Sequence, residues 1–164
     1  MNRPKLKLKQ DNFDKAVFYS GITALFIQLI ITILNYNSLP EIIPTHYNFA
    51  GEADDFGNKN SILVLPIISL VLFSAMNFLK GYPHLLNYTV KITPENAEKQ
   101  YRNGQKLLNV MATIMTFTFL FITYSQVENA TNASTKLPNN FITYFTFIVF
   151  AVIIYFFIKS QLNR

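Results

Sequence analysis

One histidine and the acidic residues around it have the clearest capacity for chemistry in this chain. His46 lies close in sequence to four carboxylates, Glu41, Glu52, Asp54 and Asp55. An imidazole with two or three carboxylates is a donor set that can bind a divalent cation. The same groups could also supply a general base, the imidazole being oriented by a carboxylate. The structural alternative is a histidine that is hydrogen-bonded within its loop, beside acids exposed to solvent.

The stretch around His46 also has the composition of a recognition surface. Its charged side chains are interleaved with glycines, which permit positive φ, and with prolines, which restrict the backbone. We therefore expect it to bind a peptide or a partner protein. No cofactor and no catalytic residue are predicted, and a divalent metal on His46 and Asp54 is left open. The candidate binding residues are Pro44, His46, Asn48, Gly51, Glu52, Asp54, Asp55 and Lys59.

Four long apolar segments must position this stretch. Each has 18 or 19 residues and contains no Asp, Glu, Lys, Arg or His. As helices they would be about 27–28 Å long, close to the roughly 30 Å of a bilayer's hydrocarbon core. The first segment is too long for a signal peptide and has no small-x-small cleavage site after it, so we expect it to be retained. The segments are residues 16–34, 62–79, 107–124 and 141–158.

The overall composition agrees with a membrane protein. Hydrophobic residues make up 51% of the 164 residues and charged residues only 14%, whereas soluble domains have about 25% charged residues. This excludes a soluble enzyme and a disordered chain. The absence of cysteine excludes zinc fingers, iron–sulfur sites and disulfides. We predict an all-α membrane protein of four transmembrane helices, forming a single domain over residues 1–164.

The distribution of basic residues predicts the orientation. Of the 14 Lys and Arg residues, all but Lys59 and Lys136 lie before the first segment, between the second and third, or after the fourth. By the positive-inside rule both termini and the loop 80–106 are cytoplasmic, and the loop 35–60 is external. A bacterial cytoplasmic membrane is the expected location. Anionic lipid headgroups account for the net charge of +5, so no nucleic-acid partner is expected.

The loops differ in character. Residues 35–60 are too apolar for a solvated linker, and we expect one or two short strands packed on the helix ends. Lys59 there could reach the headgroups, or pair with Asp54 or Asp55. Thr93 and Pro94 predict the start of a helix that continues into the third segment. Residues 125–140 are rich in Asn, Thr and Ser, which predicts a plain polar connection.

Polar residues within the apolar segments are few. Gln28 and Asn77 are predicted to form hydrogen bonds between helices. No ionisable side chain lies within the four segments. Proton- or ion-coupled carriers generally need such a residue, so the pattern argues against an autonomous pump.

The external stretch resembles a known family. Its pattern is an Ile-Pro-x-His element after the first helix, then a glycine, an acidic residue and a lysine, and a proline near the start of the second helix. It resembles a bacterial membrane domain of unknown function found at the N-terminus of sporulation-delay toxin immunity proteins (the SdpI-like family). The resemblance covers roughly residues 16–100. The positions that match are Pro44, His46, Gly51, Asp54, Lys59 and Pro66.

The resemblance implies an integral inner-membrane protein that protects its host from a membrane-active peptide toxin or signals its presence. Two other functions remain open from the residues themselves. In the first, a metal held by His46 and the loop carboxylates activates water at the membrane surface. In the second, the chain is a small transport or regulatory subunit that acts with another membrane protein.

Overall fold

A computed structural model of the protein describes residues 3–132, 136–138 and 140–164. In this part of the chain, four helices are long and apolar enough to cross a membrane. Each contains one predicted apolar segment, the second together with the short 3₁₀ helix η2, Lys59–Leu63, that leads into it. The helices are α1, Asn12–Asn35; α2, Val64–Lys80; α3, Ala97–Thr131; and α4, Phe141–Leu162.

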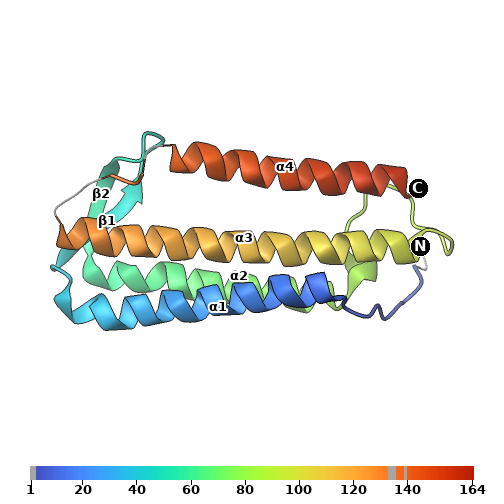
Figure 1. Ribbon diagram of the computed structural model, residues 1–164, viewed down its shortest axis with the longest axis horizontal. Helices are drawn as coiled ribbons and strands as arrows, with labels where there is room; N and C mark the ends of the chain where they lie inside the picture. The colour runs from blue at the N-terminus through green and yellow to red at the C-terminus, as the bar shows by residue number, and fades with distance from the viewer. Residues whose placement is uncertain (1–2, 133–135, 139) are drawn as a thin grey trace.

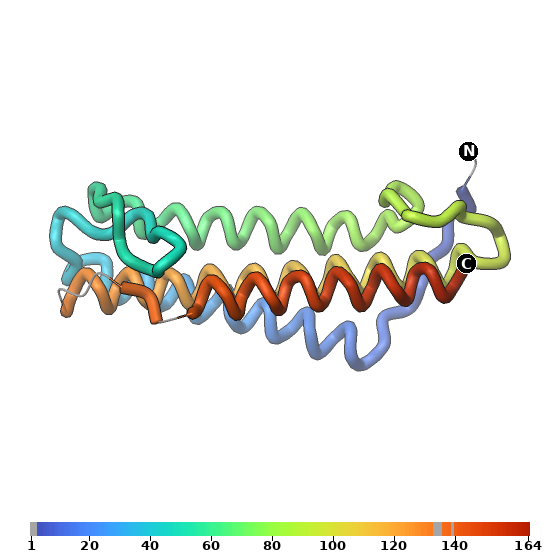
Figure 2. The backbone as a smooth tube through the Cα atoms, turned by 90° about the horizontal axis from the view of Figure 1, so that it is seen from above, coloured from blue at the N-terminus to red at the C-terminus, as the bar shows by residue number. Residues whose placement is uncertain are grey.

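The four helices run side by side as a bundle, with α3 at its centre (Figure 1). The pair α1–α2 lies on one side of α3, and α4 lies on the other. In the view turned by 90°, α4 overlaps α3, and α1 and α2 lie on opposite sides of this pair (Figure 2). Both termini lie at one end of the bundle and a β-hairpin lies at the other (Figure 1). We call these the termini end and the hairpin end.

Besides the helices, the chain contains a two-stranded β-hairpin. Strand β1, Ile42–Tyr47, pairs antiparallel with β2, Ala53–Asn58. The pairing is irregular between Pro44 and Tyr47, because proline has no N–H to donate to the ladder. The short strands expected within residues 35–60 are therefore confirmed, and the all-α prediction is corrected to a helical bundle that carries a two-stranded sheet.

Helix α3 begins later than predicted. Its first residue is Ala97, and the N-cap position is taken by Asn96 instead of Thr93. Asn96 Oδ1 accepts the N–H of Thr93 at 2.9 Å, and its Nδ2 donates to the carbonyl of Lys91 at 3.0 Å. These local hydrogen bonds form a turn over residues 93–96 that competes with the helix. The predicted continuation into the third apolar segment is confirmed.

Helix α3 also ends later than predicted. It continues to Thr131, so the first seven residues of the expected loop 125–140 are helical. Ser125, Gln126, Val127 and Asn129 are buried there, because the hairpin covers this turn of the helix. At about 1.5 Å per residue the 35-residue helix is about 52 Å long, well beyond a hydrocarbon core of roughly 30 Å. Residues 133–135 and 139 of that loop lie outside the described residues.

The interior combines close helix contacts with a few hydrogen bonds. At Gly21 of α1, an added Cβ would clash with the ring of Phe73, so glycine lets α1 and α2 approach closely. Gln28 Nε2 donates to Thr123 Oγ1 at 3.0 Å, the interhelical bond predicted for Gln28. Asn77 instead donates to the carbonyl of Phe73 in its own helix.

Candidate functional site

The hairpin is fixed to α3 by two amide side chains. Gln126 Nε2 donates to the carbonyl of Pro44 at 3.1 Å, and Asn129 Nδ2 donates to Tyr47 Oη at 3.0 Å. Burial raises the pKa of Tyr47, and the Asn129 bond opposes that shift only in part. Ile43 is fully buried in an apolar cluster with Leu39, Ile62 and Val127. The hairpin is therefore an ordered cap on the bundle.

Two of the predicted site residues form the turn of the hairpin. Asn48 Oδ1 accepts the N–H groups of Ala50 and Glu52 at 2.9 and 3.0 Å. Gly51 adopts a φ of +77°, and its carbonyl accepts the N–H of Leu137 at 2.7 Å. A Cβ at Gly51 would lie 3.3 Å from Leu137. Asn48 and Gly51 therefore shape the turn and connect it to the segment that precedes α4.

Two of the predicted carboxylates form ion pairs with lysines. Glu52 lies 2.7 Å from Lys136, and this hydrogen bond lowers the pKa of Glu52. Glu41 lies 2.9 Å from Lys59. The prediction that Lys59 pairs with Asp54 or Asp55 is therefore wrong. Its backbone N–H donates to the carbonyl of Glu41 at 2.9 Å, and this contact brings the two residues together.

His46 and Asp54 form the exposed pair of the hairpin. Their Nδ1 and Oδ1 atoms lie 2.5 Å apart, and their side chains are 66% and 45% exposed. The nearby Asp55 accepts its neighbour's N–H, that of Phe56. In the described part of the chain no three histidine, aspartate or glutamate side chains gather as a metal-binding group. The fold thus joins His46 to Asp54, while Glu41 and Glu52 have lysine partners.

A cavity of about 540 Å³ opens beneath the hairpin, between α2, α3 and α4. His46 and Tyr47 of the hairpin line it, and its walls are mainly apolar. Its polar lining includes Gln126, which is 4% exposed, and Ser61. Gln126 Oε1 and Ser61 Oγ have no hydrogen-bond partner among the described residues. Such buried groups cost about 1–3 kcal/mol each, so a ligand that donates to them would recover part of that free energy.

Sequence reasoning missed Gln126, Ser61 and Leu137 of this cavity, and Asn129, which holds the hairpin to α3. Gln126 and Asn129 lie three positions apart, a spacing that places them on one face of a helix. That spacing could have revealed them had the polar segment been recognised as helical. Ser61 and Leu137 carried no comparable signal, because only the folded chain brings them to the hairpin.

The fold and the site define a class: a protein of four helices apolar enough to cross a membrane, with a hairpin over a cavity at one end of the bundle. Residues 23–70 match a family described as "Domain of unknown function (DUF1648)". This region contains the second half of α1, the whole hairpin and the start of α2. The matched region therefore includes all eight candidate binding residues.

A relative with similarity along nearly its whole length comes from the archaeon Archaeoglobus fulgidus, where it is called an uncharacterized protein. It is 26% identical over 169 aligned residues, which cover 92% of this chain and 91% of the relative. No solved structure matches the chain. The similarity thus extends well beyond the matched domain, to α3 and α4.

Proposed function

We propose that this protein is a membrane receptor that recognises a cationic, membrane-active peptide at its hairpin end, for immunity or for sensing. The observation that carries the proposal is the position of His46. This residue belongs to the exposed pair with Asp54 and also lines the cavity beneath the hairpin. A charged surface and an apolar cavity therefore meet at one place.

The charge of the hairpin favours a cationic ligand. Residues 41–59 contain four carboxylates and one lysine. Lys59 and Lys136 pair with Glu41 and Glu52. Asp54, which pairs with His46, and Asp55 have no lysine partner among the described residues and are exposed, so basic side chains of a peptide can approach them, and the adjoining cavity suits an apolar side chain.

The proposal places the hairpin end outside the cell and both termini in the cytoplasm of a bacterial cell, so that the protein spans the cytoplasmic membrane. The support is the charge asymmetry: all but two of the 14 basic residues lie at or beyond the termini end of the helices. A peptide that acts on membranes from outside would then meet the hairpin before it reached the bilayer.

The test is peptide binding to the protein reconstituted in nanodiscs. The probe is a fluorescent amphipathic helix of leucine and lysine, with a leucine–glutamate helix of the same length for comparison. The proposal predicts that the cationic probe binds more tightly. The double variant Asp54→Asn with Asp55→Asn should weaken that binding about three- to tenfold, as expected for two exposed charges. Glu128→Gln, which removes an acid at the same end of α3, should leave it unchanged.

A second pair of variants tests the cavity. Val64 lines it and is 50% exposed, whereas Ile67, one turn further along α2, is 59% exposed and lies outside it. Val64→Trp should weaken binding of the cationic probe, and Ile67→Trp should not. Equal affinity of all variants would overturn the proposal.

Elemental analysis addresses the metal alternative with the same preparations. Zinc or manganese near one equivalent in the wild type, lost in His46→Ala, would replace the peptide-binding proposal with a metal site. Absence of metal together with charge-dependent peptide binding would support the receptor.

A further inference from the structure

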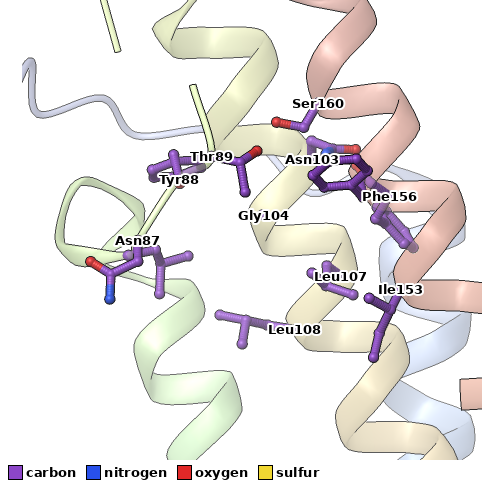
Figure 3. Close-up of a pocket in the computed structure, with 12 residues that line it drawn as sticks. Asn87, Tyr88, Thr89, Asn103, Gly104, Leu107, Leu108, Ile153, Phe156 and Ser160 are labelled. Carbon is purple, nitrogen blue, oxygen red and sulfur yellow. Dashed lines mark hydrogen bonds between the residues drawn. The ribbon is translucent and has the colours of Figure 1, made fainter. Parts of the chain in front are cut away.

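A second cavity lies at the opposite end of the bundle, also between α3 and α4. It has a volume of about 300 Å³. Leu107 and Leu108 of α3 and Ile153 and Phe156 of α4 line it. Leu107 lies next to Ile153, and the loop that contains Tyr88 and Thr89 lies at one end (Figure 3). The cavity is thus an apolar slot with a polar end.

The polar end contains an unsatisfied amide. Asn103 is 6% exposed, and its Nδ2 donates to the carbonyl of Phe156 at 2.8 Å. This bond fixes the orientation of the amide, and Oδ1 has no partner among the described residues. An occupant that donates a hydrogen bond to Oδ1 would satisfy it.

The neighbouring hydroxyl groups do not supply that hydrogen bond. Ser160 Oγ donates to Gln100 Oε1 at 2.7 Å, and Tyr88 Oη donates to the carbonyl of Pro83 at 2.8 Å. Burial raises the pKa of Tyr88, so its hydroxyl stays protonated and keeps this bond. The hydroxyls of Ser160 and Tyr88 thus donate to other acceptors, and Asn103 Oδ1 is left for another donor.

The spacing along α3 relates this cavity to the thickness of a bilayer. Asn103 is 23 residues from Gln126, the unsatisfied amide of the cavity beneath the hairpin. At about 1.5 Å per residue the two amides are about 35 Å apart, slightly more than a hydrocarbon core of roughly 30 Å. When α3 crosses the membrane, each amide lies near one boundary between acyl chains and headgroups.

An arginine is bound to the loop at the end of the second cavity. The Arg3 guanidinium donates to the carbonyls of His84 and Leu86, at 3.2 and 2.6 Å. It also lies 5.5 Å from the centre of the Tyr88 ring. A positive charge is thus fixed on the loop at the end of the cavity, and such a charge attracts a lipid phosphate.

We infer that this cavity binds a membrane phospholipid whose headgroup carries O–H or N–H donors, such as phosphatidylglycerol or phosphatidylethanolamine. One acyl chain lies between Leu107 and Ile153, the headgroup donates to Asn103 Oδ1, and the phosphate lies toward Arg3. Phosphatidylcholine has a phosphate and acyl chains but no such donor. The site is independent of the proposed peptide recognition, because it lies at the other end of the bundle.

The experiment is native mass spectrometry of the full chain, released from nanodiscs of equal parts phosphatidylglycerol, phosphatidylethanolamine and phosphatidylcholine. A lipid with donors should be retained at about one molecule per chain, about fivefold over phosphatidylcholine, the ratio expected from one hydrogen bond. Preference for phosphatidylglycerol over phosphatidylethanolamine would identify the anionic headgroup as the ligand, and the reverse would identify the ammonium group.

Two variants of α4 localise the lipid. Ile153→Trp fills the cavity, whereas Ile154→Trp, at the next residue, leaves it open; the two isoleucines are 43% and 53% exposed. Retention should fall in Ile153→Trp alone. Asn103→Leu should abolish the preference over phosphatidylcholine, with folding checked by circular dichroism. Equal retention of all three lipids by the wild type, or equal loss in both tryptophan variants, would overturn the inference.

Discussion

Two polar regions of this protein differ in how their groups are satisfied. Near the termini end, the buried Lys80 donates through Nζ to Asn77 Oδ1 at 2.8 Å and to Asn109 Oδ1 at 3.0 Å, and Asn109 Nδ2 donates to the carbonyl of Asp14 at 2.8 Å. At the hairpin end, His46 pairs with Asp54, and both side chains are otherwise exposed to solvent. We call the first region, formed by Asp14, Asn77, Lys80 and Asn109, the Lys80 cluster.

The difference follows from access to water. Lys80 and Asp14 are each 7% exposed, so the cluster must satisfy its polar groups within the protein. In doing so it joins α1, α2 and α3. The hairpin can leave charges to solvent, and those charges remain available to a ligand. The Lys80 cluster therefore joins the helices, whereas the hairpin keeps part of its charge at the surface, as the proposed recognition role requires.

The largest effect is expected from Asn109→Ala in the Lys80 cluster. The change removes both side-chain bonds of Asn109 and leaves the Lys80 ammonium with one fewer acceptor. We expect the free energy of unfolding to fall by about 2–3 kcal/mol, because buried hydrogen bonds to charged groups contribute more than neutral ones. Denaturation in mixed detergent, followed by circular dichroism, measures the change.

Asn87→Ala is the matched control for this substitution. Asn87 is exposed in the loop after α2, so its removal should change the free energy of unfolding by less than about 0.5 kcal/mol. Equal effects of the two alanine variants would show that the Lys80 cluster does not hold the bundle together.

A smaller, local effect is expected from Gly51→Ala at the turn of the hairpin. A φ of +77° is unfavourable for alanine, at a cost of about 1–2 kcal/mol. Amide hydrogen exchange in residues 42–58 should become about 5–30-fold faster, while the unfolding of the bundle changes little. Gly51→Asn is the control, because asparagine also adds a Cβ but tolerates a left-handed backbone. If exchange is equally fast in both variants, the cause is the contact of the added Cβ with Leu137 and not the left-handed backbone.

The comparison also shows which features a sequence can predict. The four apolar segments and Gln28 were predicted correctly, because an uncharged run of bilayer length and a buried amide each have few structural solutions. Asp14 and Lys80 lie just outside the predicted segments, and yet the fold buries both. Nothing in the local sequence indicates that burial, which depends on Asn109 of a distant helix.

The same limit applies to the candidate site. His46 and Asp54 were predicted from the sequence as candidate metal ligands, and their side chains are in contact in the structure. Sequence reasoning assigned the wrong partner to Lys59, because several acids lie within reach and backbone pairing decides between them. It missed Gln126, whose role depends on the hairpin folding back over α3. The backbone pairing of the hairpin accounts for the first error, and a contact between distant segments accounts for the second.

A third prediction concerns pH and a contact near the start of α1. Lys106 lies 2.5 Å from Asp11, the N-cap residue, and its hydrogen bond lowers the pKa of Asp11 from 3.8 to about 2. The charged carboxylate thus stabilises the folded state. This contribution is fully present at pH values above the ordinary pKa of 3.8 and is lost as the pH falls through the lowered pKa of about 2. The melting temperature should decrease over this range. Lys106→Met should reduce the pH dependence, and parallel curves for both proteins would contradict the assignment.

The smallest effect is expected from Glu52→Gln in the hairpin. Glu52 and Lys136 are 47% and 60% exposed, so water and salt screen their attraction. The backbone bond from Leu137 to Gly51 also remains in the variant. The melting temperature should therefore change by less than about 2 °C, and the difference should vanish near 1 M salt. Hydrogen exchange in the hairpin as fast as in Gly51→Ala would show that this ion pair, and not the backbone, holds the turn to the segment before α4.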